Sequence, residues 1–372
     1  MIIQNGHVLS ADGSHFENRA LYFDGGVIAE SGADNEVFDA AGLFVLPGMI
    51  DTHIHGYGGE EFAKPSGDYG EVPKILAQDG VTGIAATVRC MPFDEMCACA
   101  ANAAALIGRD TGGAKVLAVH SEGPFVSSVR KGAMHPPEMT CTVEAVEALQ
   151  QAAGGALKLM TMAPERENAL EVTKASKGLG FSVTMGHTDA TYAEATAAID
   201  AGAHRATHVF NAMRPLSHRE TGILGAALTD DRVRCEMIAD FVHLDPAAVK
   251  LVYRAKGAER ITLISDAGMM SGLPNGDYVV GGRVRTVKDG LCLDQQGRIA
   301  GSCYSMLKGA QNLRSLGIPL EEIAVMASYN PAKDLGVFDT VGSLEVGKCA
   351  DAIVVDDAFH IRAVFVNGGR VV

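Results

Sequence analysis

The feature that most constrains the fold is the alternation, through the middle of the chain, of short apolar segments with longer segments of helical period. The predicted strands are residues 43–46, 83–88, 115–119, 157–162, 181–185, 205–207, 234–238 and 261–265. The predicted helices are residues 94–107, 143–151, 192–199, 246–254 and 320–327. Strands that alternate with helices form crossovers and therefore a parallel sheet. We expect an α/β fold built as a (β/α)₈ TIM-like barrel, with a doubly wound open sheet as the alternative.

The two ends of the chain resemble each other and differ from the middle. Both contain short apolar segments separated by turn residues such as Asn5-Gly6. This pattern is typical of small antiparallel β units. We therefore expect residues 1–45 and 336–372 to form one small β-sandwich domain, and residues 46–335 to form the barrel.

Composition excludes several classes of protein. The 372 residues carry 31 Lys and Arg against 45 Asp and Glu, a formal net charge of −14, and 47% of them are apolar. The chain is too apolar to be disordered, and its negative charge argues against nucleic acid or an anionic membrane as a partner. We find no secretory signal peptide and no apolar run long enough to span a membrane. The eight cysteines are scattered, as in a reducing compartment, so we expect a cytoplasmic protein.

Histidines and carboxylates lie where the predicted strands end. They are His53 and His55 after the first strand, then Glu122, His187, His208, His243 and Asp266 after later strands. In a barrel, the C-terminal ends of the strands converge on one mouth. Each residue also has an ordinary interpretation: a single His is commonly a hydrogen-bonded core residue, Glu122 could line a loop, and Asp266 could cap a helix. Their joint position favours a metal site.

The donor types narrow the chemistry. His53 and His55 are two residues apart, so on a strand both imidazoles face the same side and can address one ion. Imidazole and carboxylate donors without thiolate suit Zn²⁺, Fe²⁺, Mn²⁺ or Co²⁺ in a catalytic site with a position open to water. Asp266 is then placed to act as a general base beside that water.

Several motifs together point to a known family. They are residues 46–56 (LPGMIDTHIHG), 120–125 (HSEGPF), 186–190 (GHTDA), 207–213 (THVFNAM), 238–243 (IADFVH), 265–267 (SDA) and 299–302 (IAGS). With them the chain resembles, nearly end to end, the N-acetylglucosamine-6-phosphate deacetylases of the amidohydrolase superfamily. The Glu-Gly-Pro-Phe and Asn-Ala-Met segments are the most specific, whereas residues 330–333 and 342–351 are generic to the superfamily.

The resemblance implies a metal-dependent hydrolase that converts N-acetylglucosamine 6-phosphate to glucosamine 6-phosphate and acetate in amino-sugar metabolism. It implies one or two divalent ions, with zinc favoured and iron, manganese or cobalt as alternatives. The implied primary ligands are Glu122, His187 and His208. His53 and His55 would serve a second ion that shares Glu122, and Asp266 would be the catalytic base.

The resemblance also implies a set of substrate-binding residues: His135, Asn211, Ala212, Arg219, His243, Ile299, Ala300 and Gly301. His135 is the candidate for the histidine near the acetyl group. Arg219 and His243 would reach the phosphate across the interface of a homodimer. The planar fork of an arginine suits a phosphate, although Arg219 on its own could also be a solvated loop residue.

Three alternatives stay open. The preferred sugar could be the epimer, N-acetylgalactosamine 6-phosphate. The enzyme could be another amidohydrolase that opens cyclic amides, but those commonly use a carbamylated Lys where this chain has Glu122. From a different class, the chain could be a catalytically inactive scaffold that binds a sugar phosphate. Retention of all the ligand and base positions argues against that last alternative.

Overall fold

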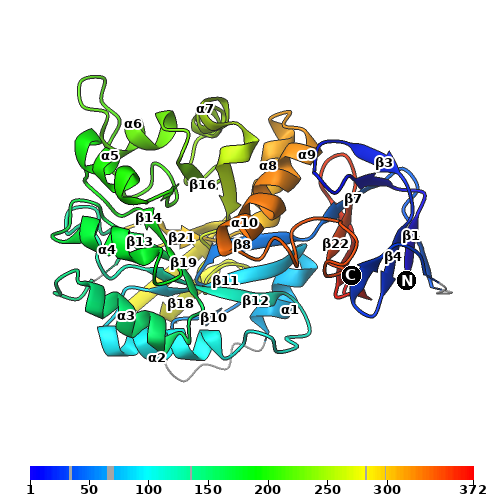
Figure 1. Cartoon of the computed structure of the whole chain (residues 1–372), viewed down its shortest axis with the longest axis horizontal. Coiled ribbons are helices and arrows are strands. Elements are labelled where there is room, and N and C mark those ends of the chain that lie inside the picture. The colour runs from blue at the N-terminus through cyan, green and yellow to red at the C-terminus, as the bar shows by residue number, and fades with distance from the viewer. Residues whose placement is uncertain (33–35, 65–70, 135, 281–282, 298) are drawn as a thin grey trace.

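An eight-stranded parallel sheet closed into a barrel forms the body of the computed structural model (Figure 1). The structure describes residues 1–372 except 33–35, 65–70, 135, 281–282 and 298. The barrel strands follow one another in chain order: β8 (Met49–Ile54), β11 (Val81–Arg89), β12 (Lys115–Glu122), β13 (Leu157–Met162), β14 (Ser182–Met185), β15 (Arg205–Ala206), β16 (Arg234–Ile238) and β17 (Ile261–Ile264).

Contacts between the first and last strands close the barrel. The backbone nitrogen of Asp266 donates to the carbonyl of His53 at 2.9 Å, and Ile54 forms a parallel bridge with Ala267. This architecture confirms the predicted (β/α)₈ barrel and excludes the open sheet.

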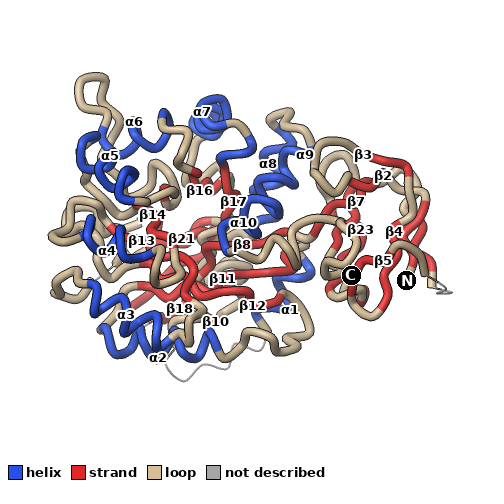
Figure 2. Tube along the Cα trace, in the orientation of Figure 1, coloured by secondary structure: helices blue, strands red, loops and turns tan. Residues whose placement is uncertain are grey.

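Helices surround the strands (Figure 2). They are α1 (Val72–Gln78), α2 (Phe93–Ala104), α3 (Val143–Ala152), α4 (Ala169–Ser176), α5 (Tyr192–Ala201), α6 (Gly222–Thr229), α7 (Pro246–Lys256), η1 (Ala258–Arg260), α8 (Met306–Ser315), α9 (Leu320–Ala324), η2 (Val325–Tyr329) and α10 (Asn330–Leu335). Local sequence explains where some of them start. Helix α5 begins at a capping box in which Thr191 and Glu194 each bond the other's backbone nitrogen. Helix α7 begins with Pro246 after the cap Asp245.

Both ends of the chain build two further sheets beside the barrel, at the right of Figure 1. One sheet has the order β5-β4-β1-β6 and the other β24-β23-β22-β7-β2-β3. Their strands are β1 (Ile2–Gln4), β2 (His7–Leu9), β3 (Phe16–Asn18), β4 (Leu21–Asp24), β5 (Val27–Ala29), β6 (Val37–Asp39), β7 (Phe44–Pro47), β22 (Ala352–Val355), β23 (Ile361–Val366) and β24 (Gly369–Arg370). Ile3, Phe23, Val354 and Phe365 share one buried cluster, so the two ends have a common core.

The predicted position of the first barrel strand, at residues 43–46, was wrong. Of the predicted residues 43–46, residues 44–46 fall in β7, which pairs with β2 and β22 in the end sheet, and the first barrel strand is β8. Gly48 alone separates the two strands; a Cβ on Gly48 would lie 2.1 Å from the Thr82 hydroxyl, so only glycine fits there. Consequently His53 lies within its strand rather than after it.

Other differences concern helix ends and one additional sheet. The predicted helix 320–327 is divided, because α9 passes into the π-helical turn η2. The additional antiparallel sheet has the order β18-β19-β20-β21 and lies between β17 and α8 in the chain. Its strands are β18 (Gly276–Val280), β19 (Arg283–Lys288), β20 (Leu291–Leu293) and β21 (Ile299–Ser302); the short pair β9 (Gly56–Tyr57) and β10 (Glu60–Glu61) follows β8. In the part of the chain that the structure describes, no helix has the length and apolar character needed to cross a membrane.

Candidate functional site

Two groups of possible metal ligands meet at the C-terminal ends of the barrel strands, and Glu122 belongs to both. The first group is His53, His55, Glu122 and Asp266, and the second is Glu122, His187 and His208. In each group the ligand atoms lie within 4.8 Å of one another. The barrel therefore brings together, from distant segments, the residues that the sequence predicted as metal ligands and as the base.

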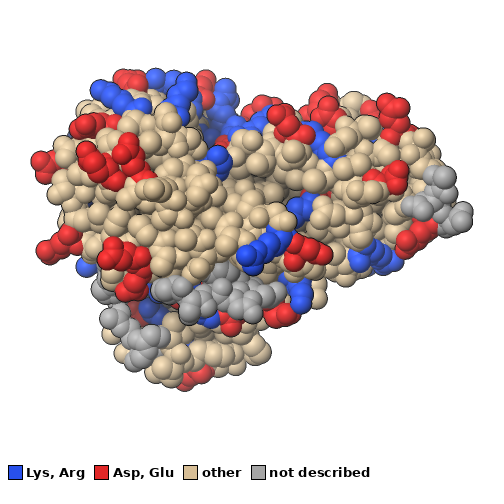
Figure 3. Space-filling view, turned by 60° about the horizontal axis from the view of Figure 1, so that its bottom comes forward, with Lys and Arg blue, Asp and Glu red and all other residues tan. Residues whose placement is uncertain are grey.

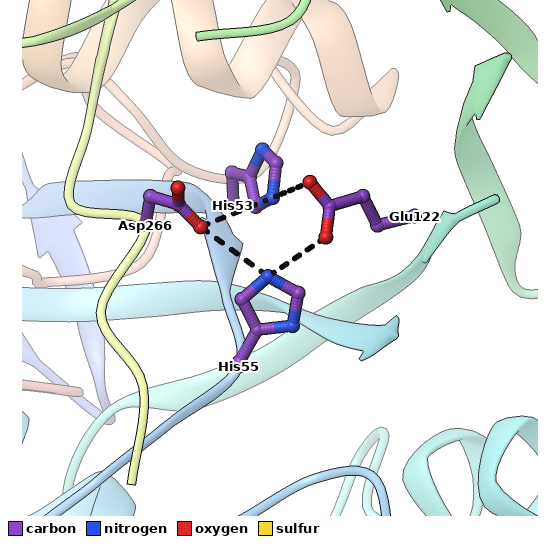
Figure 4. Close-up of side chains that lie close together, drawn as sticks. All are labelled: His53, His55, Glu122 and Asp266. Atoms are coloured by element: carbon purple, nitrogen blue, oxygen red, sulfur yellow. Dashed lines mark ion pairs between the residues drawn. The ribbon is translucent and has the colours of Figure 1, made fainter. Parts of the chain in front are cut away.

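The first group forms a compact ring of donors (Figure 4). His53 Nε2 lies 3.4 Å from Glu122 Oε1 and 3.4 Å from Asp266 Oδ1. His55 Nε2 lies 3.2 Å from Glu122 Oε2 and 3.3 Å from Asp266 Oδ1. The two carboxylates thus face each other across the imidazole pair.

The second group is held still more closely. Glu122 Oε1 lies 3.0 Å from His187 Nε2 and 3.2 Å from His208 Nε2, and these two nitrogens are 3.0 Å apart. Two imidazole nitrogens at that separation repel each other unless a proton or a cation lies between them. The carbonyl oxygen of Arg130 lies 3.0 Å from the other ring nitrogen of His187, Nδ1, and so fixes the orientation of the ring.

Backbone conformation aims several of these side chains. His187, His208 and Asp266 have φ of +47°, +27° and +49°, in the left-handed region. That conformation costs a non-glycine residue about 1–3 kcal/mol, and residues in it cluster at functional sites. Glu122, the last residue of β12, is followed by Gly123 at φ +95°, where a Cβ would lie 2.2 Å from the Cys90 sulfur. Only glycine can therefore follow Glu122 directly.

Buried carboxylates beneath the mouth fix the first group. Asp51 accepts hydrogen bonds from the backbone nitrogens of His53 and Ser265, which ties β8 to the residue before Asp266. Glu236 Oε2 lies 3.1 Å from His53 Nδ1, and Glu236 Oε1 accepts a hydrogen bond of 2.9 Å from Arg205. Burial raises the pKa of Asp51 to about 7 despite its hydrogen bonds from Ser265 and His53.

The donors fit divalent metal ions. Among the described residues, the buried His53 Nε2 makes no hydrogen bond although it faces two carboxylates. Together with the close approach of His187 and His208, this leaves lone pairs directed at positions that a cation would satisfy. The set is imidazole and carboxylate, with no thiolate, which suits a catalytic rather than a structural ion.

The charges of the cluster support one another. Burial would raise the pKa of Asp266, but the adjacent His53 and His55 lower it to about 2. Burial likewise opposes ionisation of Glu122, and His187 and His55 hold its pKa well below the usual value. Burial would lower the pKa of His55, but Glu122 and Asp266 raise it to about 9. Both carboxylates are therefore ionised at neutral pH.

A cavity of about 510 Å³ opens above this cluster, large enough for a sugar phosphate. The structure places most of the predicted site residues in its wall: His55, Glu122, His187, His208, Asn211, Ala212, His243, Asp266, Ile299 and Gly301. The sheet β18–β21 supplies one side of this wall. In the wall, His243 Nδ1 lies 2.8 Å from Asp240 Oδ2.

Four predicted residues are not placed in this wall. His53 is fully buried below the cavity, and the backbone of Ala300 belongs to β21. Arg219 is exposed on a loop outside the wall, and His135 falls outside the described residues. His243 was expected to act from a partner chain, but here it lines the cavity of its own chain.

Sequence reasoning missed several residues around the site. Glu61, Arg89, Met134 and Arg285 line the cavity, and Arg89 pairs with Glu61 at 3.4 Å. Arg285 comes from the sheet that was not predicted. One signal was available for Glu236: a carboxylate among the apolar residues Cys235, Met237 and Ile238 of a predicted strand.

Comparison with known proteins places the chain among hydrolases of one family. The family model described as "Amidohydrolase family" matches residues 44–371. An N-acetylglucosamine-6-phosphate deacetylase of Bacillus subtilis is 38% identical over 340 residues, covering 90% of this chain and 86% of the relative. An N-acetylgalactosamine-6-phosphate deacetylase of Escherichia coli O157:H7 is 33% identical over 371 residues, covering 99% and 98%.

Solved structures agree with these relatives. A mutant N-acetylglucosamine-6-phosphate deacetylase of Mycobacterium smegmatis, in complex with N-acetylglucosamine 6-phosphate, superposes with a TM-score of 0.91 at 30% identity. The alignment covers 100% of this chain and 99% of that one. The likeness therefore extends over the end sheets as well as the barrel.

Proposed function

This chain belongs to the amidohydrolase family, and from that premise we propose that it hydrolyses the acetamide of N-acetylglucosamine 6-phosphate to glucosamine 6-phosphate and acetate. The comparisons confirm the resemblance inferred from the motifs. The observation that carries the proposal is Glu122, which is shared by two imidazole pairs, opposite Asp266, at the floor of a cavity of sugar-phosphate size. Side-chain packing does not explain such an arrangement of donors.

Asp266 is the proposed base. Its carboxylate is ionised, and it lies at the cavity wall rather than below it, so it can take a proton from a water molecule as that water attacks the acetyl carbonyl. The same carboxylic acid then returns the proton to the leaving amine. His53 Nε2 and His55 Nε2 both face the same oxygen of Asp266, Oδ1, at 3.4 and 3.3 Å.

We assign the metal ligands as Glu122, His187 and His208 for a first divalent ion, and His53 and His55 with shared Glu122 for a second. Zinc suits these donors, with iron, manganese or cobalt as alternatives. When bound, such an ion lowers the pKa of water and polarises a carbonyl oxygen.

A bound phosphate group requires positive charge near it, although the protein as a whole has a net charge of −14. Acidic side chains are spread over the face in Figure 3, with Lys and Arg between them. We propose that His243, in the wall of its own chain, and Arg219, from the partner of a homodimer, bind the phosphate. The exposed position of Arg219, outside its own cavity, supports that second assignment.

The remaining contacts and the compartment are also proposals. Asn211, Ala212 and the β21 strand would hold the sugar, and His135 would contact the acetyl group. All eight cysteines are free thiols, which supports a cytoplasmic location.

The epimer N-acetylgalactosamine 6-phosphate is a second candidate substrate, favoured by the similarity to the E. coli deacetylase named for it. The test is acetate release by metal-quantified protein from both epimeric phosphates and from unphosphorylated N-acetylglucosamine. We expect N-acetylglucosamine 6-phosphate to give the highest kcat/KM. A higher kcat/KM for N-acetylgalactosamine 6-phosphate would make that epimer the preferred substrate, and no acetate from either would reject the function.

The same assay tests the phosphate contacts. Arg219→Ala should lower the preference for phosphorylated over unphosphorylated sugar by about 10-fold, the size of a charge-assisted hydrogen bond. An unchanged preference would remove Arg219 from the site.

A further inference from the structure

Glu236 lies below the cavity and outside its wall, yet it contacts both groups of ligands. It is the third residue of β16 and is 0% exposed. One carboxylate oxygen, Oε2, lies 3.1 Å from His53 Nδ1 and accepts a 3.4 Å hydrogen bond from the backbone nitrogen of His208. Its own carbonyl accepts a 2.9 Å bond from Val209.

The charge on Glu236 decides which nitrogen of His53 carries the proton. An ionised carboxylate only accepts hydrogen bonds, so Nδ1 of His53 must be the donor. In a neutral imidazole the other nitrogen, Nε2, then keeps its lone pair. That lone pair is on the side of Glu122 and Asp266, where an ion would bind.

Arg205 keeps Glu236 charged. It is itself buried, at 3% exposed, and it bonds Glu236 Oε1 through Nη2 while its Nη1 pairs with Asp334. A buried carboxylate without such a partner would give up its charge. Asp334 in turn accepts from Thr262 and pairs with Arg234, so the chain of ion pairs runs down the barrel away from the mouth.

We propose that Glu236, supported by Arg205, is a positioning residue that fixes the orientation and tautomer of His53 and thereby sets the affinity of the His53–His55 group for its ion. Carboxylates behind metal-binding imidazoles act in this way, and their loss costs about 10- to 100-fold in metal affinity. This inference rests on the proposed metal-dependent function.

The test compares two isosteric changes in the same ion-pair network. Metal-free Glu236→Gln and Asp334→Asn proteins are titrated with Zn²⁺ against a competing chelator, and the number and affinity of bound ions are recorded. We expect Glu236→Gln to weaken the second ion by about 10- to 100-fold and to leave the first ion in place. Asp334→Asn also removes a buried carboxylate from Arg205 but does not touch His53, so it should bind both ions like the wild type.

Unchanged affinity in Glu236→Gln, or an equal loss in both variants, would overturn the proposal. If Glu236→Gln does not fold, the double variant Arg205→Met/Glu236→Gln removes both charges and should show the same selective loss. Wild-type protein that binds no Zn²⁺ would instead reject the metal-dependent function itself.

Discussion

The two imidazole pairs around Glu122 are built in different ways. His53 and His55 lie on and just after one extended strand, β8, and a buried ionised carboxylate holds His53 from below. His187 and His208 come from separate strand ends, each in a left-handed conformation, and His187 is held by a backbone carbonyl.

One pair can be recognised from local sequence spacing, whereas the other depends on how the strands are arranged in the barrel. The first pair is a motif that any strand presents, because residues two apart face the same side. The second pair exists only once the barrel has closed and brought the ends of β14 and β15 together.

Loss of Glu122, the ligand that both imidazole pairs share, should affect the two pairs alike. In Glu122→Gln both pairs lose the carboxylate that they share, so we expect both ions to be lost and kcat to fall by at least about 10³-fold, the size of several kcal/mol of electrostatic stabilisation. Acetate release and metal content by mass spectrometry measure this. Glu322→Gln, which removes a carboxylate bonded to Tyr253 on the outer helices, is the matched control and should match the wild type.

Asp266 lies beside His53 and His55, but its proposed role is that of the general base. Asp266→Asn should lower kcat by about 10²- to 10⁴-fold, the usual worth of a general base, with the ion at His187 and His208 retained. Single-turnover acetate release on metal-loaded protein checks this result. Turnover near that of the wild type would remove Asp266 from its role.

The two pairs should differ in their individual effects. Because the second pair is assigned to the primary ion, His187→Asn should cost about 10³-fold in kcat, whereas His53→Asn should remove only the second ion and cost about 10-fold. Metal stoichiometry should fall in both variants. Equal losses of activity would show that both ions are required.

A smaller, pH-dependent effect concerns the phosphate end of the cavity. Burial would lower the pKa of His243, but the hydrogen bond to Asp240 raises it above 6.5. His243 is therefore cationic below pH 6.5 and loses its charge as pH rises through the elevated value, so KM for the sugar phosphate should rise a few-fold over that interval. Initial rates across pH give the curve. Asp240→Asn should shift the rise to lower pH, and the unphosphorylated sugar should not show it.

Much of the fold was accessible from the sequence because strands and helices alternate with a clear period. The error at residues 43–46 arose because periodicity does not say which sheet a strand joins. Strand β7 is as apolar as a barrel strand, and only its pairing with β2 and β22 places it elsewhere. The sheet β18–β21 escaped prediction because its strands are half exposed and lack a continuous apolar run.

The candidate site was accessible for the residues with chemical character at strand ends and inaccessible for those that act through geometry. His53, His55 and Glu122 were recognisable by type and position. Arg285 enters the cavity from a sheet that was not expected, and Glu236 contributes through a contact between strands far apart in the chain.

The pairing of β7 with β22 has a consequence for biosynthesis. Val45 of β7 pairs with Val354 of β22. Because β22 follows the barrel in the chain, β7 lacks this partner until the barrel has been translated. During that interval β7 exposes an unpaired edge, and the apolar residues of the shared core are exposed as well. Contacts so distant in sequence also form slowly. Late closure of this small unit prolongs the exposure of its apolar residues to aggregation and to chaperone binding.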